Sequence, residues 1–327
     1  MKVLFIGGTG NISTASSCLA VEKGIELWHI NRGNSGNPIR GVNTLQCDVN
    51  NRQQLEDVLS EHHWDCVVNW IAFSPDDIKR DIALFSGKTK QYVFISSASC
   101  YQTPPESPVI NEATPLSNPM WQYSRDKIAC EQLLMDAYNQ NHFPATIVRP
   151  SHTYSKVIPI AIGGWTEYTA IDRIKKGKPV VVHGDGTSLW VLTHADDFAI
   201  GFVGLLGKVE SLGEAYNITS DEVLTWNQIY QRIGLALGIE PKLVHVTSDK
   251  ICRYDSEYIG SLLGDKSSSV IFDNSKIKKL VPDFLCTTLF AEGIKTTLDW
   301  FEADPAHRII VEETNTMMDK LIAAELA

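Results

Sequence analysis

The chain begins with the stretch Met-Lys-Val-Leu-Phe-Ile-Gly-Gly-Thr-Gly-Asn-Ile-Ser-Thr-Ala, residues 1–15. Residues 3–6 form an apolar run of strand length that stops at Gly7, and a helix-compatible segment follows at 15–23. A strand, a glycine turn and a helix in this order leave free N–H groups at the positive end of the helix dipole. Such a turn binds anions, so a dinucleotide pyrophosphate can lie there without any basic side chain.

The residues of this turn are expected to have different roles. Gly7 permits the tight bend, and Gly10 lets a ligand come close to the backbone. Ser13 stands where the dinucleotide-binding fingerprint has its third glycine, and we expect a small hydroxyl residue to fit there. We therefore predict cofactor contacts from Gly7, Gly10, Asn11 and Ile12. A turn with a purely structural role is the alternative.

Composition restricts the class of protein. The 327 residues are 43% hydrophobic and 21% charged, as in ordinary globular proteins. No stretch approaches the roughly 20 apolar residues that span a bilayer, and the first strand leaves no room for a signal peptide. The seven cysteines are scattered without a Cys-x-x-Cys pair, which indicates reduced thiols, a cytoplasmic location and no metal site. The formal charge of -10 disfavours binding to nucleic acids or anionic membranes.

Strands and helices alternate over the first 150 residues. Expected strands at 3–6, 26–30, 44–49, 65–72, 91–97 and 145–148 are separated by expected helices at 15–23, 52–60, from 75 onward, and at 123–138. This alternation predicts an α/β fold with a doubly wound, Rossmann-type parallel sheet. Ligands of such sheets lie at the carboxyl ends of the strands. The residues at those ends are Gly7, Asp48, Ala72, Ser97 and Pro150.

The pattern changes after Pro150. A loop and strand at 175–185, a returning helix at 196–206 and a last strand at 214–218 are followed by helices at 225–237, 287–301 and 312–326. We predict a dinucleotide-binding Rossmann domain from residues 1–154 and 195–220. Residues 155–194 and 221–327 are expected to form a smaller α/β substrate-binding lobe.

The residues after the second and third strands bear on cofactor choice. Asn31 and Arg32 follow the second strand, where an NAD-selective site would carry a carboxylate for the ribose 2′-hydroxyl. An arginine there can pair with the 2′-phosphate, so NADP is modestly favoured over NAD. A solvated loop arginine is the alternative. Asp48 and Val49 are expected at the adenine edge, although Asp48 can equally cap the helix that follows.

Tyr123 and Lys127 are four residues apart on one expected helix, where their side chains are neighbours. A free tyrosine titrates about 3 pH units too high to act as a base at neutral pH. A lysine cation nearby, together with an oxidised nicotinamide, is expected to lower that pKa. Ser97 can hydrogen-bond the substrate oxygen opposite Tyr123. These three residues predict proton transfer at an alcohol whose carbon gains or loses hydride, with Ala72, Tyr123, Lys127 and Pro150 also touching the cofactor.

Several motifs together resemble one family. They are Gly7-Gly-Thr-Gly10-Asn-Ile-Ser13, Asp48-Val49, Phe94-Ile-Ser-Ser-Ala-Ser-Cys-Tyr101, Tyr123-Ser-Arg-Asp-Lys127, Val148-Arg-Pro-Ser-His-Thr-Tyr154, His183-Gly-Asp-Gly186 and His194-Ala-Asp-Asp197. In this order and spacing they are similar to the extended short-chain dehydrogenase/reductases, in particular the NAD-dependent epimerase/dehydratase group. The resemblance implies that Tyr123 is the acid/base, that Lys127 also holds the nicotinamide ribose, and that Ser97 completes the triad.

Two departures from the family pattern concern the substrate. The Thr-Asp-Glu run of sugar-nucleotide dehydratases is replaced by Ser97-Ala-Ser99, which disfavours 4,6-dehydration. The arginine that many members use for the substrate diphosphate is replaced by Trp190, which places a nucleotide-linked sugar in doubt, although Arg173, Arg253 or Arg308 can substitute. Trp165, Trp190 and Tyr168 are candidates for an aromatic wall beside a sugar, or for the core.

The sequence thus predicts an NAD(P)-dependent oxidoreductase or epimerase acting on a secondary alcohol or ketone of a sugar or sugar-nucleotide. A non-catalytic, dinucleotide-dependent RNA-binding or regulatory protein is the alternative, because similar glycine-turn proteins of plastids bind RNA. We expect a small sugar-like substrate, and neither membrane nor nucleic-acid partners. A homodimer is expected through the helices at 75–85 and 123–138, which present Ile78, Ile82, Ile128 and Leu134 at near-helical spacing.

Overall fold

The computed structural model describes residues 1–33 and 38–327. Its largest sheet has seven strands in the order β11-β7-β5-β4-β1-β2-β3, and all neighbouring pairs are parallel. The strands are β1 (Lys2–Ile6), β2 (Glu26–Asn31), β3 (Asn43–Gln46), β4 (Cys66–Asn69), β5 (Tyr92–Ile95), β7 (Ala145–Pro150) and β11 (Ala215–Ile218). The chain winds outward in both directions from β1, so the predicted doubly wound sheet is confirmed.

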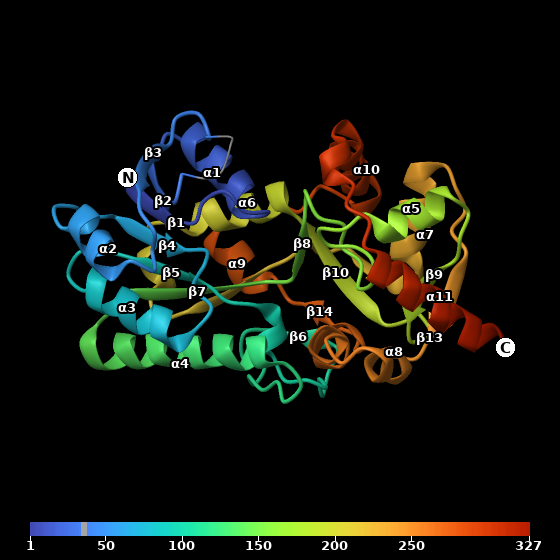
Figure 1. Cartoon of the computed structure of the whole chain (residues 1–327). Coiled ribbons are helices and arrows are strands. Elements are labelled where there is room, and N and C mark those ends of the chain that lie inside the picture. The colour runs from blue at the N-terminus through green and yellow to red at the C-terminus, as the bar shows by residue number, and fades with distance from the viewer. Residues whose placement is uncertain (34–37) are drawn as a thin grey trace.

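Helices cover both faces of this sheet (Figure 1). One face carries α2 (Arg52–Leu59), α3 (Pro75–Phe85) and α4 (Gln122–Asn141), and the other carries α1 (Ser13–Glu22) and α6 (Ala195–Leu205). The alternation of side chains along β1 explains its apolar run. Leu4 and Ile6 enter the first core, and Val3 and Phe5 enter the second, so both faces of the strand are buried.

Local signals set several helix boundaries. Helix α3 begins with a capping box in which Ser74 accepts from the backbone of Asp77 and Asp77 accepts from that of Ser74, with Pro75 in the first turn. Helix α4 ends at His142, which has the left-handed backbone conformation of a helix C-cap. Asn51 caps α2 through its side chain, so the alternative that Asp48 caps this helix is wrong.

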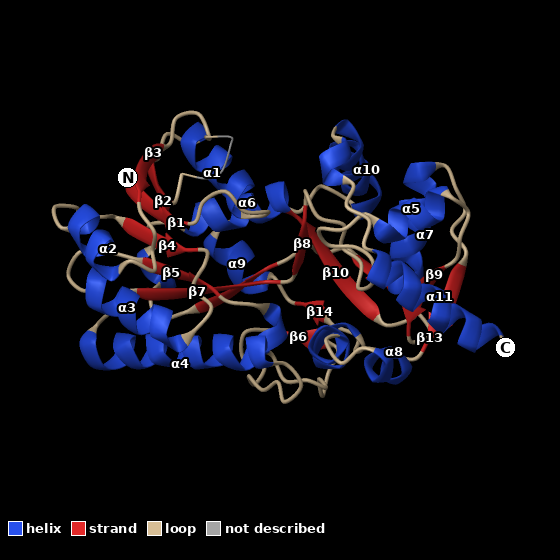
Figure 2. Ribbon diagram, viewed as in Figure 1, coloured by secondary structure: helices blue, strands red, loops and turns tan. Residues whose placement is uncertain are grey.

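Most of the rest of the chain forms small sheets and helices at the right of Figure 2, whereas α9 (Ser275–Leu280) lies beside α6. Strands β8 (His152–Tyr154), β10 (Leu189–His194) and β12 (Val223–Thr225) form one sheet; β9 (Val180–His183) pairs with β13 (Leu243–Val246), and β6 (Val109–Ile110) with β14 (Ile271–Phe272). The helices are α5 (Thr169–Lys175), α7 (Trp226–Leu237), α8 (Ser248–Tyr254), the π-helical η3 (Ile259–Lys266), α9 (Ser275–Leu280), α10 (Phe290–Ala303) and α11 (Glu312–Leu326). Short 3₁₀ turns are η1 (Ala98–Cys100), η2 (Val209–Ser211) and η4 (Pro305–His307).

The division of the chain into two units is less simple than the sequence boundaries. Tyr154, Trp226 and Phe290 belong to a core built from residues between 154 and 322. Helix α9, which the sequence placed in the smaller lobe, packs with β11 and α6 instead, and Ile277 and Phe284 enter the core of the large sheet. The proposed domain boundaries therefore stay a prediction.

Within residues 1–33 and 38–327, no helix combines the length and the apolar character that a membrane crossing requires. The predicted cytoplasmic location stays a prediction.

Candidate active site

A cavity of about 870 Å³ lies at the carboxyl ends of the large sheet. It is bounded by the glycine turn, the end of β5, the start of α4, the end of β7 and the segment η3. A second pocket of about 350 Å³ adjoins it across Gly7 and Ile71, which line both. Of the predicted site residues, Gly7, Gly10, Asn11, Ile12, Ser97, Tyr123, Lys127 and Pro150 line the larger cavity, and Asn31, Arg32, Asp48 and Val49 line the smaller one.

The glycine turn is shaped by its neighbours. Gly7 has φ +81°, and a Cβ atom there would lie 2.7 Å from the Ile71 side chain. At Gly8 a Cβ atom would lie 2.2 Å from the ring of His29, which explains a glycine that the fingerprint does not require. His29 is buried and its Nε2 lies 2.9 Å from the Ser17 hydroxyl. Burial lowers the pKa of His29 to about 4, so the ring is neutral and packs against the turn without a charge.

Two polar side chains of the turn, Ser13 and Asn11, form hydrogen bonds within the protein. Ser13 Oγ accepts the N–H of Gly10 at 2.7 Å, so the expectation that a small hydroxyl residue fits in place of the third glycine is confirmed. Asn11 donates from Nδ2 to the carbonyl of Thr153 at 3.1 Å, and its Oδ1 accepts the N–H of Lys156 at 3.1 Å. The turn is thereby fixed to β8 and to the segment that follows it.

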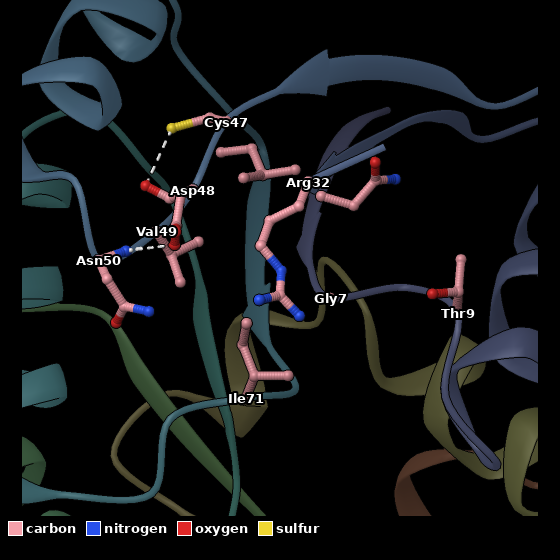
Figure 3. A pocket seen from close by; sticks show the side chains of 10 residues that line it. Gly7, Thr9, Arg32, Cys47, Asp48, Val49, Asn50 and Ile71 are labelled. Atoms are coloured by element: carbon pink, nitrogen blue, oxygen red, sulfur yellow. Dashed lines mark hydrogen bonds between the residues drawn. The ribbon is translucent and has the colours of Figure 1, made fainter. Parts of the chain in front are cut away.

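The smaller pocket holds the residues expected at the adenine end. Asn31 Oδ1 accepts the N–H of Gly33 at 2.9 Å, and Asp48 Oδ1 accepts the N–H of Asn50 at 3.0 Å. Arg32 extends into the pocket between Gly7 and Val49, with its guanidinium above Ile71 (Figure 3). Arg32 is also exposed to solvent, so its predicted contact with the cofactor stays a prediction.

Lys127 is anchored by the loop after β4 and by the end of β5. Its buried ammonium donates to the carbonyl of Ala72 at 2.7 Å and to that of Ile95 at 2.8 Å. The Nζ atom lies 5.7 Å from the centre of the Tyr123 ring. The prediction for Ala72 needs correction, because its buried side chain lines neither pocket, while Ile71 lines both. Ala72 acts through its carbonyl, which the residue type alone does not reveal.

The electrostatics of the phenol differ from the expectation. Burial raises the pKa of Tyr123 to about 12, and a hydrogen bond with Ser97 only partly opposes this shift. The expected lowering of the phenol pKa by Lys127 is wrong for the protein's own groups, because desolvation outweighs the ammonium at this distance. Burial also lowers the pKa of Lys127, to about 8. The positive charge of an oxidised nicotinamide, which favours the phenolate, stays the expected source of a lower Tyr123 pKa.

A chain of hydroxyl groups supports Ser97. Its Oγ lies 2.9 Å from Ser99 Oγ, which in turn accepts from Ser124 Oγ at 2.8 Å. Asn118 donates to the carbonyl of Ser99 at 2.8 Å and to that of Gly264 at 2.7 Å. The polar groups around Ser97 are thus tied to η3, which closes the far side of the cavity.

Aromatic side chains form much of the cavity wall. Trp121, Trp165 and Trp190 line the cavity, which agrees with the proposed aromatic wall for two of its three candidates. Tyr168 does not line it and belongs to the core, where its hydroxyl bonds Glu302. Sequence reasoning missed Trp121.

Charged residues on this wall were not foreseen either. None of the arginines suggested as diphosphate ligands lines the cavity: Arg173 is buried and bonds Asp319 at 2.7 Å, Arg308 lies 3.4 Å from Glu302, and Arg253 is on α8. The cavity instead has Lys266, paired with Asp265 at 2.9 Å, both from η3. A π-helical stretch is common at functional sites, but no local sequence motif announces this one. Thr9, Ile71 and Phe73 were also missed.

Known proteins share this architecture. The 2'-dehydrokanamycin reductase of Streptomyces kanamyceticus is 23% identical over 292 residues, covering 87% of this chain and 80% of that protein. The chloroplast stem-loop binding protein of 41 kDa b of Arabidopsis thaliana is 24% identical over 75% of this chain and only 65% of its own length. The UDP-glucuronic acid 4-epimerase from Bacillus cereus, solved with UDP-glucuronic acid and NAD, has a TM-score of 0.72 at 18% identity, covering 93% of this chain and 99% of that one.

At these sequence identities, the similarity to each of these proteins shows the fold alone. The model of the NAD dependent epimerase/dehydratase family matches residues 3–219, two thirds of the chain, from β1 to the end of the large sheet. That match includes the glycine turn, Ser97 and the Tyr123–Lys127 helix. The chain therefore belongs to the NAD-dependent epimerase/dehydratase family, enzymes of the extended short-chain dehydrogenase/reductase type, as its motifs predicted.

Proposed function

We propose that the protein is an NAD(P)-dependent oxidoreductase or epimerase that moves hydride to or from a secondary carbinol of a sugar-like substrate. The observation that carries this proposal is the joint placement of Tyr123, Ser97 and Lys127 on one cavity with the glycine turn. In this proposal Tyr123 exchanges a proton with the substrate oxygen, and Ser97 hydrogen-bonds that same oxygen. Lys127, held by two backbone carbonyls, contacts the nicotinamide ribose.

The residues of the turn fit a dinucleotide. A Cβ atom at Gly10 would meet only the Ser13 hydroxyl, at 3.3 Å, so nothing else in the protein requires a glycine here and its surface faces the cavity. The ten-residue helix α1 begins directly after this turn and adds the positive end of its dipole. The bound dinucleotide supplies or accepts the hydride. Gly7, Gly10, Asn11 and Ile12 would hold its pyrophosphate, and Asp48 and Val49 its adenosine end.

Burial of the Tyr123 phenol suits proton donation. A phenol whose pKa is raised to about 12 stays protonated at neutral pH and can donate when a ketone is reduced. In the oxidation direction the phenol has to lose its proton first. The oxidation rate at saturating substrate is therefore expected to rise with pH, while the reduction rate stays flat around neutral pH.

Hydride transfer is tested by following the absorbance of reduced nicotinamide while the purified protein is offered keto-sugars and sugar alcohols, free and nucleotide-linked. Turnover with any of them supports the proposal. Absence of turnover together with dinucleotide-dependent RNA binding would establish the alternative. Recovery of an epimer without net change of the cofactor would identify an epimerase, and accumulation of oxidised cofactor a reductase.

The orientation of Arg32 supports a preference for NADP(H). A charge-assisted contact to the 2′-phosphate stabilises the complex by about 1.5–3 kcal/mol. We therefore expect NADP(H) to bind roughly tenfold to hundredfold more tightly than NAD(H). Arg32→Ala should abolish this preference, measured by calorimetric titration with both cofactors. Arg253→Ala, which removes an exposed arginine of α8 outside both pockets, is the control and should leave the preference intact. Equal affinities of the wild type for the two cofactors would refute the proposed preference for NADP(H).

We also propose a homodimer that forms through α3 and α4, which lie side by side on one face of the sheet (Figure 1). The side chains first suggested need revision, because Ile78 and Leu134 are buried in the chain's own core. Ile82 and Ile128 are only half-buried and remain available. Light scattering at micromolar protein should give twice the monomer mass. Replacing Ile82 and Ile128 together by lysine should give the monomer mass, and a monomeric wild type would refute the proposal.

A further inference from the structure

Trp165 has an unusual backbone and an unusual exposure. Its φ is +61°, and His142 is the only other non-glycine residue with a positive φ in the described part of the chain. A bulky side chain rarely adopts this conformation, and residues held in it gather at ligand-binding sites. The indole is 47% exposed, lines the cavity and packs on the His152 ring with 5.3 Å between the ring centres.

The loop that presents this indole is closed by hydrogen bonds and closely packed. Ile158 and Trp165 exchange two backbone hydrogen bonds, of 2.8 and 2.6 Å, and so close the loop. Inside it, a Cβ atom at Gly163 would lie 2.5 Å from Met318, and one at Gly164 would lie 2.3 Å from Ile160. The loop thus carries an exposed aromatic ring on a closely packed base, although burial of the ring would have given more stability.

Away from the glycine turn, the charges on the cavity wall do not suit a second diphosphate, that of a nucleotide-linked substrate. Among the described residues that line the cavity, the lysines and arginines are Lys127 and Lys266. The ammonium of Lys127 already donates to two carbonyls, and that of Lys266 lies 2.9 Å from Asp265. His152 adds no charge, because burial lowers its pKa well below the ordinary value. Trp190, 3% exposed, packs on Trp226 and brings no cation to this wall.

We propose that the substrate is a glycoside without a nucleotide diphosphate, and that Trp165 is the platform on which the apolar face of its sugar ring stacks. The inference deepens the proposed function and rests on it for the reaction, but not for binding. A diphosphate would bring two negative charges against a wall whose cations already have partners, and leaving such charges unpaired is costly. A neutral ring needs only the aromatic surface and a few hydrogen bonds, which Ser97, Tyr123 and the Asp265–Lys266 pair supply.

The first arm of the test removes the platform. Trp165→Gly should raise KM for a glycoside substrate about tenfold with kcat within about twofold, because stacking acts on binding. Its thermal midpoint should stay within a few degrees of the wild type, since glycine adopts this backbone without strain. Trp165→Phe should restore most of the affinity. His142→Gly is the control, because it replaces the other side chain with a positive φ by glycine at the end of α4, outside the cavity. It should leave KM unchanged.

The second arm compares ligand classes by calorimetry on the enzyme loaded with NADP⁺. Methyl hexopyranosides, neutral disaccharides and an aminoglycoside are titrated against UDP, UDP-glucose and dTDP-glucose. At least one unactivated glycoside should bind, weaken in Trp165→Gly, and not be displaced by UDP. Binding of nucleotide-linked sugars alone, binding of no glycoside, or an unchanged affinity in Trp165→Gly would overturn the inference. Glycoside binding without hydride transfer would instead refute the proposed function and leave the inference intact.

Discussion

Replacing Tyr123 by phenylalanine is expected to lower kcat by about a thousandfold while the cofactor affinity stays within a few fold of the wild type. General acid–base groups typically contribute about 10²–10⁴ to rate. The substitution removes only the phenol hydroxyl and keeps the ring, which packs 5.0 Å from Trp121 and 6.4 Å from Phe73 between ring centres. The loss should therefore fall on proton transfer and spare the shape of the cavity.

Single-turnover measurement of nicotinamide absorbance separates the two effects, and calorimetry gives the cofactor affinity. Tyr138→Phe is the matched control, since it removes a phenol from the other end of the same helix, outside the cavity. It should behave as the wild type. If Tyr123→Phe kept full activity, another group would have to supply the proton.

Lys127→Met should damage turnover, cofactor binding and stability together. Two backbone carbonyls, of Ala72 and Ile95, would lose their donor within a buried region, and each unsatisfied group costs about 1–3 kcal/mol. We expect the free energy of unfolding to fall by about 2 kcal/mol or more, and kcat/KM by at least about a hundredfold.

Denaturant unfolding, calorimetry and steady-state rates test these three effects of Lys127→Met on one preparation. Lys79→Met, which removes an exposed lysine of α3 that pairs with Asp76, should change none of them. An unfolded Lys127→Met variant would support the anchoring role but would leave catalysis untested. Lys127→Arg then provides the catalytic test, because it keeps a donor and a charge. An Lys127→Arg variant that folds and is fully active would contradict a specific ammonium contact.

The features that the sequence predicted well have short-range causes. The buried run of β1, the turn at Gly7 and the start of α3 at Ser74 each follow from residues adjacent in the chain. Strand ends meet along one edge of a parallel sheet, so Gly7, Asp48, Ser97 and Pro150 were brought together correctly.

The features that the sequence did not reveal depend on long-range packing. Gly8 is required by the ring of His29, a residue of the next strand. Lys266 reaches the cavity from η3, more than a hundred residues after Tyr123, with no motif around it. The direction of the Tyr123 pKa shift follows from burial, which residue spacing cannot express. Residue type likewise did not distinguish Ile71 from Ala72. The path of the chain after β4 determines which of these two side chains faces the pockets.

The two hydrogen bonds of Asn11 have a thermodynamic consequence. They join the turn that would hold the pyrophosphate to Thr153 and Lys156, and Thr153 lines the same cavity as the substrate groups. When one ligand binds and orders this shared segment, the other ligand binds to a segment that is already ordered. Cofactor and substrate are then linked ligands, and linkage is reciprocal: the factor by which cofactor strengthens substrate binding equals the factor by which substrate strengthens cofactor binding.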